Sequence, residues 1–543
     1  MPYGDDKHQL ILNELVNILG ERYVEDDKAI MEAYYRDSLT LSEAAQGRHE
    51  FIVLPGTVED VQQIFKLANR YQFPVSISGS GMMQALCNAV PGYDYWCFID
   101  PKRLNTLKVD PKNMYVEVGA YVSLGQVQAE ALKYGLFHGV PGASTSSIAV
   151  GHSMFQQIAW TCWRTGTARN ILAAEWVLPT GELVYTGSLA AGGDDPCWGE
   201  GPGPDPHGIY RGHLGNLGTY GVMTKLWLKL WPIPGRFTQW PSNGVPQPEK
   251  KSQLPEKYFR TFPINFPNQK AAVEAMIAMG KAEIGGYLLK FGPWDYVCWY
   301  TKSMEEFWEE WFSDYWMDVK FNWHSVVIGL WGFAGPKQTD YEEKVMNQII
   351  KEFGGHVMPE PYLTKIRNCF QPNIIRDAHR HRFTRLGRPV LTGSTIDSML
   401  DTLRSAKEDI KIKDSVTPPL GVMGPQLKFW PYDFGHAAWT EIDALAEKSD
   451  EFEELAMHSI TPAQVKDAFE QDTFYCQLMA ALNLVGPKYY NVDQLFGRIK
   501  VALDPNNIAN PTRMLNVKAW LESEARKASG IEEEADGPGS MAF

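Results

Sequence analysis

The segment from Ser76 to Gln84, Ser-Ile-Ser-Gly-Ser-Gly-Met-Met-Gln, constrains the fold more than any other part of the chain. It continues an apolar run, Phe73 to Ile77, that is typical of a β-strand. Small residues allow a turn in which several backbone N–H groups converge on one anion, because no bulky side chain keeps the anion away. The segment therefore predicts a phosphate cradle at the end of a strand.

The residues upstream of this loop predict a helix. Pro55-Gly56-Thr57 leads into an apolar stripe at helical spacing, with acidic residues in the first turn. The stripe consists of Val58, Val61, Phe65 and Ala68, and the acidic residues are Glu59 and Asp60. The order strand, capped helix, strand and loop suits a phosphate cradle, although tight turns of similar composition are common.

Length and charge restrict the class of protein. A chain of 543 residues is too long for one ordinary core and predicts two or three domains. Its content of 44% apolar and 21% charged residues is typical of a globular protein. The formal charge of −14 argues against nonspecific binding to nucleic acid or to an anionic membrane surface.

The cysteines and the chain ends predict a cytoplasmic protein. The seven cysteines are scattered and form no C-x-x-C pair, which is typical of reduced thiols. Histidines and acidic residues lack the spacing of zinc or iron ligands, so we expect no metal. The N-terminus lacks the apolar core of a secretory signal, and no apolar run approaches the roughly 18 residues of a membrane span.

Changes in composition predict the domain limits. The first part alternates β-rich runs, helices and glycine-rich turns, and it ends at the prolines Pro232 and Pro234. The second part is dense in tryptophan and predicts an α+β domain with an antiparallel sheet. An amphipathic helix, Val492–Leu503, and a mobile tail follow. The predicted parts are residues 1–235, 236–490, 491–522 and 523–543.

Local patterns predict several individual elements. Glu175–Leu178 and Glu182–Tyr185 form a hairpin around a turn that contains Gly181, which supplies a positive φ. A last strand of the first part covers Val222–Leu230. The predicted helices are Leu124–Tyr134, Gln269–Ala282, Asp340–Glu352, Ser398–Lys411 and Pro462–Glu470.

Three further segments share the small residues or the turn chemistry of the first loop. They are Gly139–Gly151, Gly215–Thr224 and Asp504–Pro511. The order and spacing of all four resemble the vanillyl-alcohol oxidase / p-cresol methylhydroxylase family of flavoproteins, which have a PCMH-type FAD domain. The resemblance covers residues 45–235 and 490–515, and more loosely the domain between them.

The resemblance implies an α+β fold. Two α+β subdomains enclose FAD, and a cap domain built on an antiparallel sheet flanked by helices covers the isoalloxazine ring. The FAD-binding domain is split, because residues 1–235 are rejoined by residues 491–522.

The resemblance also implies the cofactor-binding residues, position by position. The pyrophosphate loop corresponds to Ser78, Gly79, Ser80, Gly81, Met82 and Gln84. The segment beside the diphosphate, ribityl chain and ring corresponds to Pro141, Gly142, Ser144, Thr145, Ser146 and Gly151. Gly221 and Val222 correspond to the strand entry near the adenine and ribose, and Asn510 and Arg513 to the turn near the flavin.

The chain departs from the family in the attachment of FAD. Family members often carry a histidine in the phosphate loop that joins the flavin covalently, whereas Ser80–Met83 contains none. A second attachment motif is missing around Ala159–Cys162. The alternatives in the cap are His379, His381, His436 and Tyr432. We therefore favour noncovalent FAD.

A second departure concerns the substrate. Phenol-oxidising members place a Tyr-Arg pair before the C-terminal helix, where this chain has Tyr475 followed by Cys476. A phenolate would lose a charge-assisted partner, which argues against a para-alkylphenol unless an arginine such as Arg380, Arg382 or Arg385 replaces it. The candidate catalytic residues are Tyr475, His436, Arg380 and Asp472, with Tyr475 or His436 as the base.

Two clusters in the second part have alternative interpretations. The basic run from Arg376 to Arg382 suits an anion site over the flavin or a solvated helix face. The tryptophan-rich run from Trp294 to Trp331 suits an apolar substrate pocket, or a core or subunit interface.

The predicted activity is FAD-dependent oxidation of a small organic molecule, aromatic or hydroxylated, by hydride transfer to flavin N5. The electron acceptor is oxygen, a cytochrome or another redox protein, and the chain is a homo-oligomer or a subunit of a complex. One alternative is a 2-hydroxy-acid dehydrogenase, in which the arginines between Arg376 and Arg385 bind the carboxylate. The other is a flavin-binding subunit without activity of its own.

Overall fold

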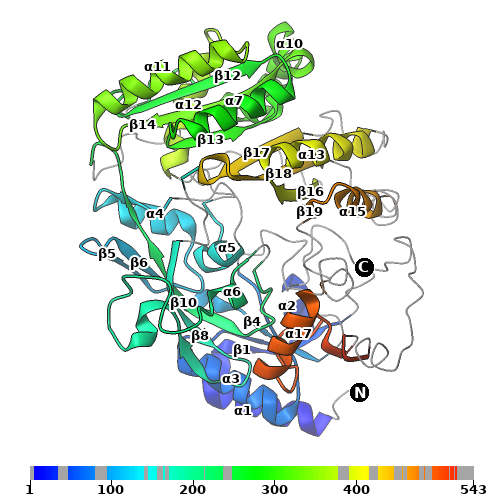
Figure 1. Cartoon of the computed structure of the whole chain (residues 1–543). Coiled ribbons are helices and arrows are strands. Elements are labelled where there is room, and N and C mark those ends of the chain that lie inside the picture. The colour runs from blue at the N-terminus through cyan, green and yellow to red at the C-terminus, as the bar shows by residue number, and fades with distance from the viewer. Residues whose placement is uncertain are drawn as a thin grey trace.

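The computed structural model describes most of the chain (Figure 1). The described residues are 5–34, 47–79, 95–139, 145–155, 163–164, 170–212, 215–236, 248–252, 254–376, 390–414, 426–445, 455, 461–475, 482, 492–512, 514–518 and 520–522. The predicted tail 523–543 and the basic run from residue 377 onward lie outside them.

A four-stranded sheet in the order β1-β2-β4-β3 forms the first subdomain. Strands β2 and β3 pair parallel with β4, and β1 pairs antiparallel with β2. The capping box that begins α3, made by Thr57 and Asp60, agrees with the predicted helix start. The elements are α1 (Asp5–Leu19), β1 (Val24–Glu25), α2 (Lys28–Met31), β2 (His49–Val53), α3 (Val58–Tyr71), β3 (Val75–Ile77) and β4 (Trp96–Ile99).

A five-stranded antiparallel sheet in the order β5-β6-β10-β8-β9 forms the second subdomain. Its core includes side chains of α4, α5 and α17, so the helix from the far end of the chain belongs to this unit. The strands are β5 (Leu107–Asp110), β6 (Tyr115–Gly119), β8 (Ile171–Val177), β9 (Leu183–Tyr185) and β10 (Val222–Lys229), with β7 (Leu136–Phe137) paired to β11 (Trp231–Pro232) beside them. The helices are α4 (Leu124–Leu132), α5 (Ala149–Phe155), α6 (His207–Tyr210) and α17 (Val492–Leu503).

An eight-stranded antiparallel sheet, here called the cap sheet, lies above the two smaller sheets in Figure 1. Its order is β15-β12-β14-β13-β17-β18-β16-β19. The strands are β12 (Phe259–Phe266), β13 (Tyr287–Lys290), β14 (His324–Trp331), β15 (His356–Val357), β16 (Val390–Asp397), β17 (Gln426–Tyr432), β18 (Ala437–Leu445) and β19 (Phe474–Tyr475).

Helices cover both faces of the cap sheet with two separate apolar cores. One core contains side chains of α7, α11 and α13, and the other contains side chains of α8, α9, α10 and α12. These helices are α7 (Gln269–Lys281), α8 (Pro293–Tyr300), α9 (Met304–Trp311), α10 (Asp314–Asn322), α11 (Pro336–Glu352), α12 (Tyr362–Arg376) and α13 (Met399–Asp414), and α15 (Thr461–Glu470) follows them in the chain. The predicted α+β class is confirmed.

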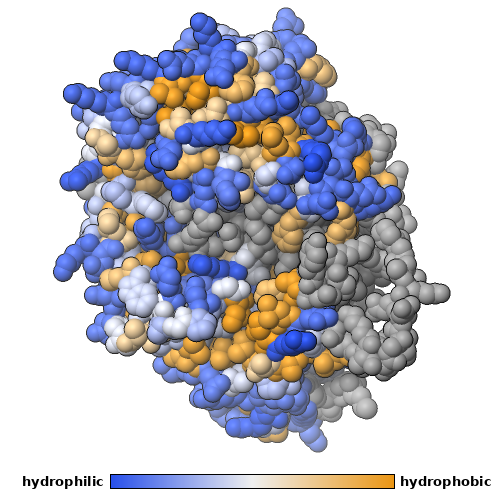
Figure 2. All heavy atoms as spheres, in the orientation of Figure 1, coloured by the Kyte–Doolittle hydropathy of each residue, from blue (hydrophilic) through white to orange (hydrophobic). Residues whose placement is uncertain are grey.

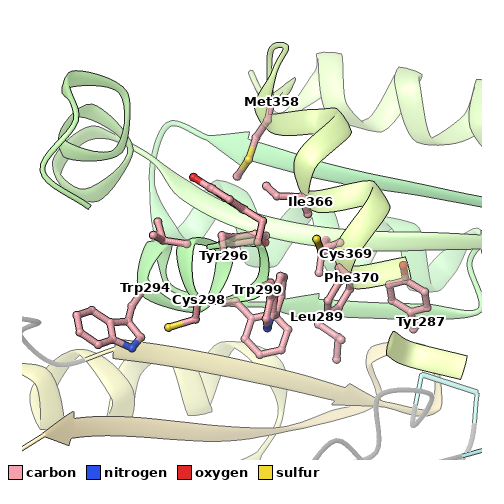
Figure 3. Packing of buried hydrophobic residues seen from close by; sticks show 14 of the residues in the cluster. Tyr287, Leu289, Trp294, Tyr296, Cys298, Trp299, Met358, Ile366, Cys369 and Phe370 are labelled. Carbon is pink, nitrogen blue, oxygen red and sulfur yellow. The ribbon is translucent and has the colours of Figure 1, made fainter. Parts of the chain in front are cut away.

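The tryptophan-rich run builds the second of these cores. Trp294, Trp299, Trp311 and Trp316 are buried on the short helices α8 to α10, which the sequence pattern did not predict. Figure 3 shows the cluster, in which Trp299 stacks on Phe370 with ring centroids 4.0 Å apart. These four tryptophans therefore belong to the core, as the second of the two interpretations predicted.

The cap sheet is joined to the smaller sheets through buried aromatic contacts. Trp163 is 1% exposed, and its Nε1 donates to the Ile284 carbonyl at 2.7 Å. The Phe434 N–H donates to the Trp163 carbonyl at 2.6 Å. Phe137 of β7 packs edge-on against Trp331 of β14 at a centroid distance of 5.4 Å. These contacts hold the cap against the second subdomain.

In the view of Figure 2, apolar side chains gather near α17 and also over the cap, among hydrophilic side chains. Leu495 and Val501 of that helix are 58% and 38% exposed. Within the described residues, no helix has the length and apolar character that crossing a bilayer requires.

Candidate functional site

The first and second small-residue segments meet next to the first sheet. Ser78 and Gly79 follow β3, and a Cβ atom built on Gly79 would lie 3.2 Å from Cγ1 of Ile148. The second segment is fixed to the start of α4, because the N–H groups of Leu124 and Gly125 donate to the carbonyls of Ser147 and Thr145, both at 2.9 Å. Two backbone hydrogen bonds thus fix the second segment at the start of α4, and the Ile148 side chain brings it next to Gly79.

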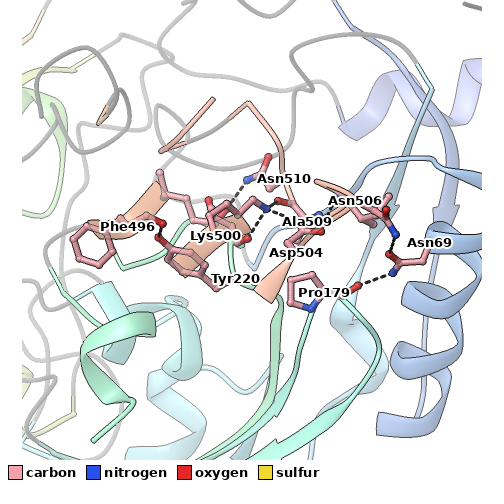
Figure 4. A network of polar contacts seen from close by, with 12 residues as sticks. Asn69, Pro179, Tyr220, Phe496, Lys500, Asp504, Asn506, Ala509 and Asn510 are labelled. Atoms are coloured by element: carbon pink, nitrogen blue, oxygen red, sulfur yellow. Dashed lines mark hydrogen bonds and ion pairs between the residues drawn. The ribbon is translucent and has the colours of Figure 1, made fainter. Parts of the chain in front are cut away.

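The third and fourth segments join the same place (Figure 4). Ala509 forms a parallel bridge with Val75 of β3, and the Asn510 N–H donates to the Val75 carbonyl at 2.8 Å. The side-chain amide of Asn510 donates from Nδ2 to the carbonyl of Leu217 in the third segment. All four segments therefore converge, although they are far apart in the sequence.

A buried lysine holds the returning C-terminal segment. Nζ of Lys500 donates to the carbonyls of Thr219 at 2.7 Å and Ala509 at 2.6 Å and to the Asp504 carboxylate. Asp504 accepts in turn from the N–H groups of Ile508 and Ala509, both at 2.8 Å. Burial lowers the pKa of Lys500, and the neighbouring Asp504 carboxylate opposes that shift. Sequence reasoning missed this pair, whose only signal is the i,i+4 spacing of the two charges.

The convergence point has the features of a site for a phosphate-bearing ligand. A Cβ atom on Gly221, whose φ is +104°, would lie 2.2 Å from the Val177 carbonyl oxygen, so no side chain fits there. The Ser76 hydroxyl and Nδ2 of Asn216 are buried, and neither has a hydrogen-bond partner in the described part of the chain. Buried donors without partners indicate a ligand rich in oxygen.

The described members of the predicted cofactor-binding set lie in or beside the four converging segments. They are Ser78, Gly79, Thr145, Ser146, Gly151, Gly221, Val222 and Asn510. The others, Ser80, Gly81, Met82, Gln84, Pro141, Gly142, Ser144 and Arg513, lie outside the described residues. The role of each residue toward the cofactor stays a prediction.

The predicted catalytic residues are spread over the far half of the cap sheet. Tyr475 pairs with Thr395 on the edge strand β19. Asp472 is exposed in the turn between α15 and β19, with φ +54°, and His436 is exposed where the β17–β18 hairpin returns. Arg380 lies outside the described residues. Their catalytic roles stay predictions.

A buried aromatic cluster of the cap sheet adjoins the second subdomain. Trp430 and Trp439 are paired across β17 and β18, and both belong, with Tyr432, to the buried cluster on that face. Phe474 of β19 packs against this cluster, which also contains Phe137 from the second subdomain.

No group of three or more metal-ligating side chains occurs among the described residues.

Some of the residues that build the two smaller sheets match a known family. Residues 49–187 match the family described as an FAD binding domain. This chain contains an FAD-binding domain. The match includes the first two of the four small-residue segments, and a phosphate-bearing ligand at their convergence is consistent with FAD.

Two relatives illustrate the range of similar sequences. The chain is 28% identical over 206 residues to a D-lactate dehydrogenase of Archaeoglobus fulgidus, which covers 37% of this chain and 43% of that protein. It is 27% identical over 190 residues to the 4-cresol dehydrogenase [hydroxylating] flavoprotein subunit of Pseudomonas putida, which covers 33% of this chain and 34% of that protein. The chain therefore matches less than half the length of these relatives.

Two solved structures extend the similarity of fold to nearly the whole chain. One is 4-ethylphenol oxidase from Gulosibacter chungangensis in complex with isoeugenol, with a TM-score of 0.74 at 17% identity, covering 94% of this chain and 97% of that one. The other is p-cresol methylhydroxylase with substrate bound, with a TM-score of 0.72 at 17% identity and the same coverage. The FAD-binding domain and its cap thus have the PCMH-type fold, as predicted, while membership of the vanillyl-alcohol oxidase branch stays a prediction.

Proposed function

We propose that the protein is an FAD-linked oxidoreductase that oxidises a small aromatic or hydroxylated molecule. FAD, when bound, supplies the redox chemistry by accepting a hydride at N5. The observation that carries the proposal is the convergence of the four small-residue segments, which suits a phosphate-bearing cofactor such as FAD. The buried aromatic cluster of Trp430, Tyr432 and Trp439, against which Phe474 packs, lies in the cap sheet that adjoins the second subdomain, and an aromatic boundary of this kind suits a planar substrate.

The chain's own contribution is to orient the substrate and to take its proton. Removal of a hydroxyl proton makes loss of hydride from the neighbouring carbon easier. Tyr475 is the proposed base, since its strand β19 belongs to the same sheet as the buried aromatic cluster. His436 and Asp472 are the alternatives, and both are exposed at ends of strands of that sheet.

A second candidate is the oxidation of a 2-hydroxy acid. It is favoured by the similarity to the D-lactate dehydrogenase of Archaeoglobus fulgidus. In that case Arg380 and its neighbours bind the carboxylate of the substrate. Replacement of the family arginine by Cys476 favours this candidate over a phenolate.

We also propose that FAD is bound noncovalently and that the protein passes its electrons to a separate acceptor. The loop Ser80–Met83 offers no histidine for attachment. The similarity to a protein named as a flavoprotein subunit supports assembly with an electron acceptor, for which oxygen, a cytochrome or another redox protein are the candidates.

An anaerobic substrate screen tests the proposal. Substrates bleach the visible flavin band, and para-alkylphenols, benzylic alcohols and D-2-hydroxy acids separate the two candidates. The variant Trp430→Ala should raise KM for an aromatic substrate, whereas Arg380→Ala should abolish turnover of a hydroxy acid with FAD retained. Dithionite bleaching without bleaching by any substrate would reject the oxidoreductase and favour a subunit without activity of its own. Acid precipitation reports whether the flavin is covalently attached.

A further inference from the structure

Four buried polar side chains lie near the two described ends of the second small-residue segment, Gly139–Gly151. His138 lies directly before it and His152 directly after it, while Gln128 comes from α4 and Asn170 from the residue before β8. Their exposed fractions are 5%, 9%, 1% and 5%. The atoms with no hydrogen-bond partner in the described part of the chain are Nε2 of His138, both ring nitrogens of His152, Nε2 of Gln128 and Oδ1 of Asn170.

Contacts link these side chains into one cluster. The His138 backbone N–H donates to Oε1 of Gln128 at 3.4 Å, and the His152 ring lies near enough to His138 to help lower the pKa of that ring. Nδ2 of Asn170 lies 3.6 Å from the position of a Cβ atom on Gly139. The fold therefore brings α4, β7, α5 and β8 together around both ends of the segment.

Such a cluster is costly unless something binds to it. A buried polar group without a partner destabilises a protein by about 1–3 kcal/mol. Burial lowers the pKa of His138 to about 3 and that of His152 to about 4, so both rings are neutral near pH 7. The neutral His152 ring carries one donor and one acceptor without partners, whereas His138 leaves only Nε2 without one. The cluster thus offers uncharged donors and acceptors to its ligand.

A cluster that contains both neutral donors and neutral acceptors suits one half of FAD better than the other. A diphosphate presents only acceptor oxygens and negative charge, which the Asn170 carbonyl oxygen and an imidazole acceptor would repel. The isoalloxazine edge presents carbonyl oxygens and one N–H group, and the ribityl chain presents hydroxyls. Both therefore match neutral donors alternating with acceptors.

We propose that the cluster of Gln128, His138, His152 and Asn170 binds the uncharged flavin half of FAD, the isoalloxazine edge and ribityl hydroxyls. The inference rests on FAD as the cofactor of the proposed function. It makes the two histidines positioning residues for the ring, while backbone N–H groups of the small-residue segments bind the diphosphate.

The test uses the FAD-loaded protein with His152→Leu and Asn170→Leu. Each lost hydrogen bond should raise the Kd for FAD about tenfold, which corresponds to about 1.4 kcal/mol. The ionic-strength dependence of that Kd should stay unchanged, because no charge contact is lost. The midpoint potential of the flavin and the shape of its visible band should shift, and neither measurement needs a substrate, so failure of the proposed reaction is seen separately.

The matched control is His207→Leu, which removes an equally buried imidazole outside the cluster, one that is bonded through Nδ1 to Asp205. It should lower the melting temperature without moving the flavin potential. Where His152→Leu does not fold, His152→Asn and His138→Gln replace it, and they should give smaller shifts of the same kind. A Kd and a potential equal to those of the wild type, or changed only as much as in the control, would overturn the proposal.

Discussion

Lys500 and Asp504 form an ion pair whose two side chains are completely buried, one turn apart at the end of α17. A buried pair is tolerated only when its remaining hydrogen-bonding groups are also used. Here the three N–H groups of the ammonium have three acceptors, and the carboxylate accepts two backbone N–H groups as well. The pair thus fixes the turn that carries Asn510 against β3 and Leu217.

The variant Lys500→Met tests this role. It leaves the buried Asp504 carboxylate without its cation and removes the hydrogen bonds to the Thr219 and Ala509 carbonyls. This loss should destabilise the protein by about 3–5 kcal/mol. Because the turn next to the FAD-binding segments loosens, the Kd for FAD should rise as well. Thermal melting and flavin retention on gel filtration measure both effects.

The control for this variant is Lys518→Met, which replaces an exposed lysine of the same C-terminal segment. It should keep the wild-type melting temperature and flavin content. A Lys500→Met protein with unchanged melting and FAD retention would show that the buried pair does not hold the segment.

Gly221 should tolerate no side chain. Gly221→Ala places a Cβ atom 2.2 Å from the Val177 carbonyl oxygen, where β10 begins beside β8. Gly192→Ala is the matched control, since its φ of +82° is also positive but nothing lies within 4 Å of the new Cβ atom. Strain alone should cost the control about 1–2 kcal/mol. Gly221→Ala should lose clearly more stability and also FAD, as measured by urea unfolding and flavin fluorescence.

The sequence was sufficient for those parts of the site that have local signals. The capping box at Thr57, the hairpin around Gly181 and the helix Val492–Leu503 were predictable because neighbouring residues determine them. The FAD-binding fold was also predictable, because the order of the four small-residue segments resembles that of a known flavoprotein family.

The remaining features depend on contacts between distant residues. Nδ2 of Asn506 donates a hydrogen bond to Oδ1 of Asn69, 437 positions earlier in the chain, and no local sequence pattern predicts such a pair. Lys500 lies in the predicted amphipathic helix Val492–Leu503, and its burial arises only from packing against the third segment. The polar groups of His138 and His152 stand out only once burial and missing partners are known.

Trp163 should determine how firmly the cap is held. Trp163→Ala removes the hydrogen bond to the Ile284 carbonyl and the edge-on contact with Phe434, whose ring centroid lies 5.5 Å away. Loss of a buried tryptophan should cost about 3–5 kcal/mol. Limited proteolysis should then cut between the second subdomain and the cap. Trp198→Ala, at a tryptophan that is 44% exposed, should leave the cleavage pattern unchanged. Equal resistance of both variants would contradict this role.

His49 should make the protein sensitive to mild acid. The ring is 1% exposed in β2, and burial lowers its pKa to about 3. The unfolded chain binds a proton below pH about 6.5 while the folded chain stays neutral, so stability is complete above that pH and falls toward pH 3. Each pH unit in this window should cost about 1.4 kcal/mol. His49→Leu should therefore lose less unfolding free energy between pH 7.5 and 5.5 than the wild type, by about 1.4 kcal/mol, because only the unit below pH 6.5 lies in the window. His356→Leu, at an exposed histidine, should retain the wild-type slope, and an unchanged slope in His49→Leu would contradict the assignment.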